Sequence, residues 1–153
     1  MKTLELKIPP PVVALLLAIA MWLAATVLSS LAFTLPARLA IALAAAALGV
    51  AISTAGTVSF WRARTTVNPT RPDATSSLVA TGIYRLTRNP MYLGLLLVLA
   101  GWAIYLSNAV TFVGPLLFLL YINRFQILPE ERALAAKFGV AFDDYRRRTR
   151  RWI

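Results

Sequence analysis

The chain has 153 residues, of which 59% are hydrophobic and 14% are charged, and its formal net charge is +10. This balance excludes an ordinary water-soluble domain and indicates an integral membrane protein with room for one compact domain. Cysteine and histidine are absent from the sequence, which excludes disulfides, thiolate chemistry and the usual histidine base or zinc ligand. We therefore expect no metal site.

Four apolar runs predict four transmembrane helices, because about 20 apolar residues cross the hydrocarbon core of a bilayer. The predicted helices cover residues 12–33, 36–60, 91–107 and 110–128, with a loop at 61–90 and a tail at 129–153. A cleavable signal peptide is the alternative for the first run, but this run is too long and lacks a clean small-residue cleavage site. The predicted fold is an all-α integral membrane protein in which residues 1–153 form one membrane domain.

The basic residues predict how this domain is oriented. With four spans, every lysine and arginine except Arg38 lies on the same side of the membrane. The positive-inside rule then places both termini and the loop at 61–90 in the cytoplasm of a cell with an inner or plasma membrane. A basic tail also suits nucleic acid, but these residues adjoin apolar helices, which favours anionic membrane lipids as partners and argues against nucleic acid.

Smaller features predict local structure. Gly49, Ser53 and Gly56 form a stripe of small residues that predicts close packing of another helix. Residues 65–77 are polar and rich in proline, which predicts a loop that could act as a lid. The sequence Pro129-Glu130-Glu131 is typical of a helix start, and the tail after it is expected to form a cytoplasmic amphipathic helical segment at the membrane surface.

The first candidate site lies where the loop enters the third helix. Asn89 and Pro90 suit the N-cap and first position of that helix, and a cap alone is one interpretation of the pair. Arg85 and Arg88 precede them, and a helix N-terminus beside arginines can hold a carboxylate or phosphate. Gly94 would leave room for a flat group of a ligand.

The second candidate site follows the fourth apolar run. Arg124 interrupts this run near its cytoplasmic end, either to reach lipid head groups or to face the acids Glu130 and Glu131. If the helix continues through Pro129, the seven-residue spacing places Asn123 with Glu130, and Arg124 with Glu131, on common faces. Acids beside arginines can hold an ammonium, a ribose or a guanidinium.

Together these two segments resemble a known family. Four segments resemble the isoprenylcysteine carboxyl methyltransferases and the related phospholipid methyltransferases. They are Arg-Asn-Pro-Met-Tyr-Leu-Gly at 88–94, Glu130-Glu131, Lys137-Phe-Gly and the tail from Tyr145 to Arg151-Trp152. The resemblance covers roughly residues 65–153, and Asn89 stands where eukaryotic members have histidine. It implies S-adenosyl-L-methionine as the methyl donor, with S-adenosyl-L-homocysteine as product. The implied cofactor-binding residues are Tyr84, Arg88, Asn89, Pro90, Met91, Tyr92, Gly94, Glu130 and Glu131, and the implied catalytic residues are Arg124 and Glu130.

The expected function is S-adenosylmethionine-dependent methyl transfer to a lipophilic acceptor at the cytoplasmic membrane face. The acceptor stays open between an isoprenylcysteine-like carboxylate, a phospholipid amine and a lipophilic thiol, and so does the oligomeric state. Two alternatives remain: an NADPH-dependent membrane reductase of the sterol-reductase type, and a non-enzymatic scaffold with a basic lipid-binding face. A Gly-x-Gly-x-x-Gly motif is absent, which excludes a Rossmann cofactor site.

Overall fold

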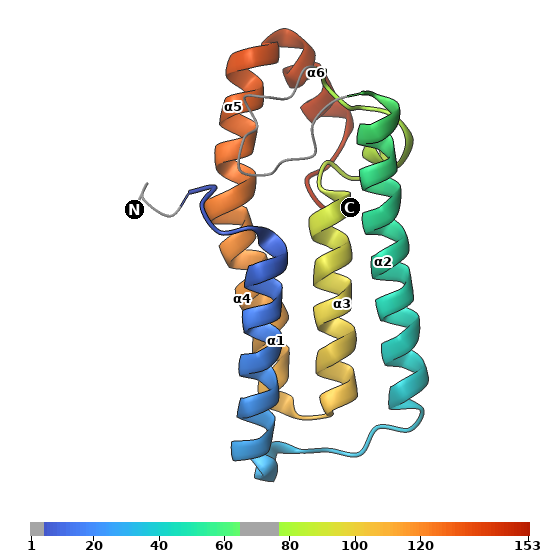
Figure 1. Ribbon diagram of the computed structural model, residues 1–153, viewed down its shortest axis with the longest axis vertical. Coiled ribbons are helices and arrows are strands. Elements are labelled where there is room, and N and C mark those ends of the chain that lie inside the picture. Colours follow the sequence, from blue (N-terminus) through green and yellow to red (C-terminus); the bar gives the residue numbers. More distant parts are fainter. Residues whose placement is uncertain (1–4, 65–76) are drawn as a thin grey trace.

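The computed structural model describes residues 5–64 and 77–153, and it is helical throughout this part, with one isolated bridge between Ala32 and Asn108. Figure 1 shows α1, α2, α3 and α4 side by side, with α5 continuing α4 beyond the bundle. The α-helices are α1 (Pro10–Val27), α2 (Arg38–Arg62), α3 (Pro90–Leu106), α4 (Val113–Ile122), α5 (Leu128–Phe138) and α6 (Val140–Arg148). Short 3-10 turns are η2 (Ser29–Leu31), η4 (Gly82–Arg85) and η5 (Ala109–Phe112), and η6 (Asn123–Ile127) is a π-helix.

Three helices of the described part are long and apolar enough to cross a membrane: Pro10–Val27, Arg38–Arg62 and Ala109–Phe138. The third predicted span, α3, is apolar but has 17 residues, fewer than the usual length of a spanning helix. The all-helical membrane architecture is confirmed, while the count of four spans stays a prediction. The predicted loop at 65–77 lies almost entirely outside the described residues.

The predicted helix start at Pro129 is wrong, because α4, η6 and α5 form one unbroken helix. Within η6 the N–H of Leu128 donates to the carbonyl of Asn123, which is the five-residue spacing of a π-helix. Pro129 has no N–H to offer the carbonyl four residues before it, that of Phe125. The N–H of Leu6 donates to this carbonyl instead, at 3.0 Å. The N-terminal segment therefore supplies the hydrogen bond that Pro129 cannot give to this carbonyl.

The predicted packing of small residues is confirmed. Gly49 and Gly56 are buried on α2, where the backbones of α2 and α3 approach each other closely. A Cβ atom at Gly49 would lie 2.5 Å from the carbonyl oxygen of Gly94, and one at Gly101 would lie 2.8 Å from that of Ala42. Ser53 also donates to the carbonyl of Met91 across the same contact, at 3.2 Å. The α2–α3 pair is thus a close-packed unit that holds the start of α3 in place.

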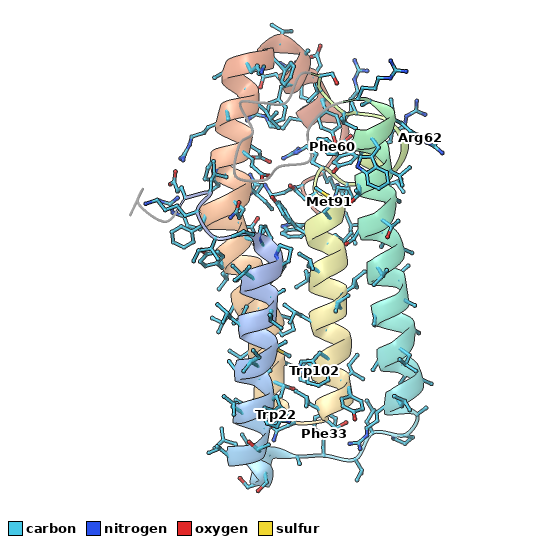
Figure 2. The ribbon with its side chains drawn as sticks, viewed as in Figure 1. Trp22, Phe33, Phe60, Arg62, Met91 and Trp102 are labelled. Carbon is cyan, nitrogen blue, oxygen red and sulfur yellow. The ribbon has the colours of Figure 1, made fainter. Side chains whose placement is uncertain are left out.

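The tail packs on the protein. α5 ends before Gly139, whose φ of +51° suits glycine. α6 then turns back beside α5 (Figure 1). Phe142 is 1% exposed, so the apolar face expected to lie on lipid is used for packing within the protein. Figure 2 shows Trp22, Phe33 and Trp102 at one end of the bundle, and Phe60, Arg62 and Met91 at the other, where α5 and α6 also lie.

Candidate functional site

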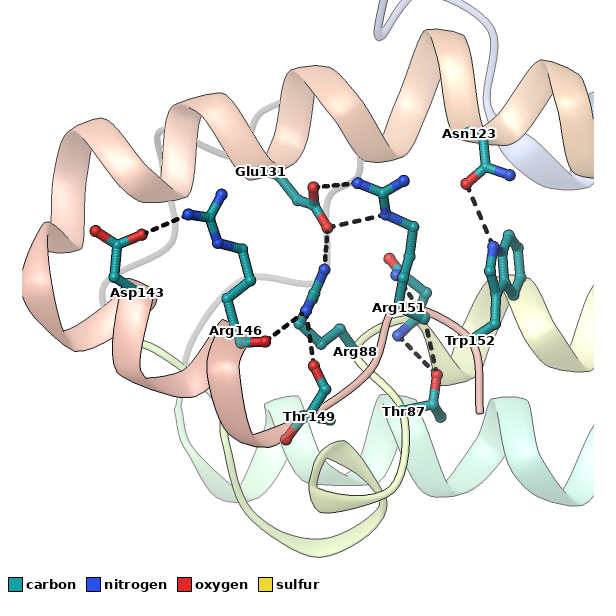
Figure 3. A network of polar contacts seen from close by, with 10 residues as sticks. Thr87, Arg88, Asn123, Glu131, Asp143, Arg146, Thr149, Arg151 and Trp152 are labelled. Atoms are coloured by element: carbon teal, nitrogen blue, oxygen red, sulfur yellow. Dashed lines mark hydrogen bonds and ion pairs between the residues drawn. The ribbon is translucent and has the colours of Figure 1, made fainter.

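The C-terminal segment, residues 149–152, lies along the start of α3. The N–H of Arg88 donates to the carbonyl of Arg150 at 3.0 Å. The hydroxyl of Thr87 and the side-chain amide of Asn89 donate to the carbonyl of Arg151 at 3.2 and 2.9 Å. Backbone groups of the last residues thereby join the segment that enters α3, which brings the C-terminal arginines beside the motif at 88–94 (Figure 3).

Glu131 lies between two arginines at the centre of this network. Its carboxylate accepts from Arg88 at 2.7 Å, and Arg151 donates from Nε and Nη2 at 3.2 and 2.7 Å. Arg88 also donates to the carbonyl of Thr149 at 2.6 Å, while its Nε is buried without a hydrogen-bond partner in the described part of the chain. The side chains of Arg88 and Glu131 are only 10% and 14% exposed, so these bonds are screened weakly by water.

Glu130 has a different environment from its neighbour. The buried Tyr92 donates its hydroxyl proton to the Glu130 carboxylate, which joins α3 to α5. No ion pair connects Glu130 to an arginine within residues 5–64 and 77–153. The adjacent acids therefore differ in chemistry: Glu131 is neutralised by two cations, while Glu130 meets a neutral phenol and can accept a further proton or hydrogen bond.

Tyr84 lies beside the site, in η4 before the start of α3. Its ring packs edge-on against Phe60 at the end of α2, with centroids 5.4 Å apart, and its carbonyl accepts from the Tyr145 hydroxyl at 2.8 Å. Burial, followed by the charge of the nearby tyrosine and glutamate, raises the pKa of Tyr84 well above its usual value. Burial likewise raises the pKa of Tyr145. Both phenols are therefore neutral proton donors at physiological pH.

Asn89 and Gly94 lie where they were predicted but act differently. Asn89 is at the N-cap position before Pro90, yet its side chain makes no cap hydrogen bond, because its amide is turned toward Arg151. Gly94 leaves no room for a ligand, since a Cβ there would overlap Gly49 and Ser53 of α2. Pro90 and Met91 also contact α2, at Gly56, so this side of α3 is occupied by helix packing.

Arg124 does not join the acids at the site. It donates to Glu5 at 2.8 Å, and Arg132 pairs with the other oxygen of the same carboxylate. The predicted pairing of residues seven apart is wrong, because the π-helix inserts one extra residue and shifts common faces to a spacing of eight. Arg124 accordingly shares a face with Arg132, and Asn123 shares one with Glu131. Figure 3 shows Asn123, which accepts from Trp152 at 3.3 Å, and Glu131 pointing toward the same C-terminal segment.

The structure therefore brings together Tyr84, Arg88, Asn89, Tyr92, Glu130 and Glu131 from the predicted set. It adds Thr87, Arg151 and Trp152, which were not singled out as site residues. The only sequence signal for the last two was their place in the basic and aromatic tail. Glu5 carried no signal, because an isolated acid in a basic tail is not distinguished by any pattern.

Comparison with known proteins identifies the family of this chain. A protein of Haemophilus influenzae described only as uncharacterized is 44% identical over 63 residues, which is 41% of this chain and all of that protein. No solved structure matches the chain. The family model for phospholipid methyltransferase matches residues 37–141, which include α2, α3, α4, α5, Tyr92, Glu130 and Glu131. With this match over more than half of its length, the chain belongs to the phospholipid methyltransferase family.

Proposed function

We propose that this membrane protein transfers a methyl group from S-adenosyl-L-methionine to a lipophilic acceptor at the cytoplasmic face of the membrane. One observation carries the proposal: the Tyr92–Glu130 hydrogen bond joins two motifs that are 38 residues apart in the sequence. Membership of a methyltransferase family supports methyl transfer over the reductase and the scaffold. The meeting point supports these two motifs as the place where the reaction occurs.

The residues present fit the polar groups of the proposed donor, which carries a carboxylate, an ammonium and ribose hydroxyls. The buried Arg88 Nε–H has no acceptor among the described residues and suits the carboxylate. Glu130 faces no described arginine and suits the ammonium or a hydroxyl. Arg151 holds Glu131 at 2.7 Å, which keeps the second acid charged and in place.

When bound, S-adenosylmethionine supplies an electrophilic methyl group, so the protein has to align and desolvate the nucleophile. A carboxylate or thiolate acceptor needs no base. An amine acceptor has to lose a proton, and Glu130 is the residue we assign to take it, because no described arginine neutralises this carboxylate. Asn89 cannot act as a base, and its amide is engaged with Arg151. We do not assign a catalytic role to Arg124, because its side chain pairs with Glu5.

The proposed acceptor has a hydrocarbon part, and an apolar groove runs along the bundle beyond the start of α3. This groove, of about 680 Å³, is formed by α1, α2 and α3 and includes Leu95, Ala46 and Leu99. Leu95 lies one turn beyond Tyr92 on α3, and the groove extends from there toward Trp102 at the opposite end of the bundle (Figure 2). We assign the hydrocarbon chain of the acceptor to this groove.

The orientation of the protein follows from its charges. α5 carries Glu130 and Glu131, α6 carries the arginines at 146–148, and both helices lie at the same end of the bundle as the end of α2 and the start of α3 (Figure 1). The positive-inside rule supports a cytoplasmic location for this end and for both termini. A cytoplasmic site gives the soluble methyl donor access while the acceptor stays in the membrane.

Calorimetry with S-adenosyl-L-homocysteine on the detergent-purified protein tests the proposal. We expect saturable binding that Glu130→Gln and Glu131→Gln each weaken more than tenfold. The matched control is Asp143→Asn, which removes the same charge from the described ion pair with Arg146 on α6. Folded wild-type protein that gives no saturable heat refutes the proposal, and saturable NADPH binding in its place would support a reductase.

A further inference from the structure

The N-terminal segment, residues 5–8, makes three kinds of contact with the π-helix η6 and the turn that follows it. The N–H of Leu6 donates to the carbonyl of Phe125 at 3.0 Å. The side chain of Gln126, which is fully buried, donates to the carbonyl of Ile8 at 2.7 Å. Glu5 forms ion pairs with Arg124, which lies within the π-helix, and with Arg132 on α5. The hydrogen bond from Arg124, with the charge of Arg132, lowers the pKa of Glu5 despite some desolvation.

These contacts require η6 to be π-helical. In a regular α-helix, residues eight apart are separated by about 80° around the axis, so Arg124 and Arg132 would not face one carboxylate. The extra residue in η6 removes this difference and brings both guanidinium groups to Glu5. The carbonyl of Phe125 is open to Leu6 because Pro129 has no N–H.

The same extra residue sets the direction of the two acids at the site. Reverting η6 to an α-helix would rotate everything after it by about 100° relative to α4. Glu130 would then turn away from Tyr92, and Glu131 from Arg88 and Arg151, although no residue of the site had changed. Single π-turns inside α-helices are rare and are often found at functional sites.

We propose that Glu5 and the backbone of residues 6–8 are a positioning element that holds η6 in its π-helical register and thereby aims Glu130 and Glu131 into the site. Glu5 touches neither acid, so it acts through the helix. The ligand-binding part of the test rests on the proposed function, while the distance measurement does not.

The absence of cysteine allows the register to be measured with a single pair of spin labels. Ala136 is exposed on α5, and Trp61 is 70% exposed at the end of α2, so Ala136→Cys and Trp61→Cys provide the two labelling positions. Rotation of α5 by 100° moves a side chain at a radius of 5–6 Å by about 8 Å. Pulsed electron paramagnetic resonance resolves a change of this size.

Two substitutions weaken the positioning element without touching the site. Glu5→Gln removes the charge that both arginines share, and Pro129→Ala restores an N–H that competes with Leu6 for the carbonyl of Phe125. In the double variant we expect a second population of label distances and S-adenosylhomocysteine binding weakened at least tenfold. Glu5→Asp, which keeps the charge, is expected to restore most of both. The control Asp143→Asn leaves both unchanged.

A purely stabilising role for Glu5 would lower the melting temperature with the label distances unchanged, and that result overturns the proposal. If the double variant does not fold, Glu5→Gln alone decides, because a distance distribution identical to the wild type refutes the register effect. Wild-type protein that fails to bind S-adenosylhomocysteine contradicts the proposed function and leaves the distance result standing.

Discussion

Substitution of Gly94 by alanine distinguishes helix packing from ligand space at the start of α3. A Cβ at this position would lie within 3.0 Å of the carbonyl oxygen of Gly49 and the hydroxyl of Ser53. Ordinary contact begins at 3.4 Å, and the carbonyl oxygen of Gly49 would be closest among the backbone atoms, so α2 and α3 would have to separate by about 1 Å. The nearest atoms include the backbone of α2, which cannot rotate away.

Overpacking of this kind costs about 1–3 kcal/mol, and contact with backbone places Gly94→Ala at the upper end of that range. Alanine recovers up to about 1 kcal/mol through its higher helix propensity, which leaves a net loss of about 2 kcal/mol. For a chain of this length, that loss corresponds to a melting temperature lower by about 4–8 °C. Thermal unfolding in detergent, followed by circular dichroism, measures it.

Gly56→Ala is the matched control. Its Cβ would meet side-chain atoms, Met91 at 2.9 Å and the Pro90 ring at 3.1 Å, where Gly94 would meet backbone, so we expect a smaller decrease than for Gly94→Ala. The reasoning is refuted if Gly94→Ala keeps the wild-type melting temperature but loses S-adenosylhomocysteine binding, because that result assigns the space to the ligand.

Three further predictions concern other parts of the protein. Two arginines lower the pKa of Glu5, so its contribution to stability is present at neutral pH and is lost as the pH falls below the ordinary value of 4.5. The melting temperatures of the wild type and Glu5→Gln should therefore converge in acid. A difference that stays constant with pH contradicts this. Tyr145→Phe removes the bond to the Tyr84 carbonyl, worth about 1 kcal/mol, and should lower the melting temperature by about 2–4 °C; no change would show that this bond contributes nothing. Ala46→Phe fills the apolar groove and should weaken binding of a long-chain lipid acceptor while S-adenosylhomocysteine affinity stays constant in calorimetry; equal loss of both contradicts the assignment of the groove.

The apolar runs and the small residues predicted the helices and the α2–α3 packing correctly, because both depend on local composition and on the 3.6-residue period. The α3 segment shows how much composition alone can predict. Its apolar character is evident from the sequence, and its 17 residues are fewer than a spanning helix usually has. The hydrogen bond from Tyr92 to Glu130 joins the two motifs on which the family resemblance rests.

The errors share one cause, which is that tertiary contacts decided the geometry. The π-helix is held by Leu6 and Glu5, which are more than 115 residues away in the sequence, and a single inserted residue redirects Arg124. Asn89 has the composition of a cap, but a distant carbonyl in the C-terminal segment binds its amide. No periodicity within one helix contains either effect. Pro129 was the visible sign, since a proline inside a continuous helix implies a local departure from α-helical bonding.

Methyl transfer itself is the most direct test of the proposed function. Purified protein in vesicles of bacterial lipid would be incubated with S-adenosylmethionine that carries a radioactive methyl group, and the label would then be extracted into organic solvent. We predict label in the lipid fraction with wild-type protein and with Asp143→Asn, and at least a tenfold lower rate with Glu130→Gln. Folded wild-type protein that transfers no label to these lipids or to a prenylated acceptor added to the vesicles, or an undiminished rate with Glu130→Gln, would contradict the site proposed at Tyr92, Glu130 and Glu131.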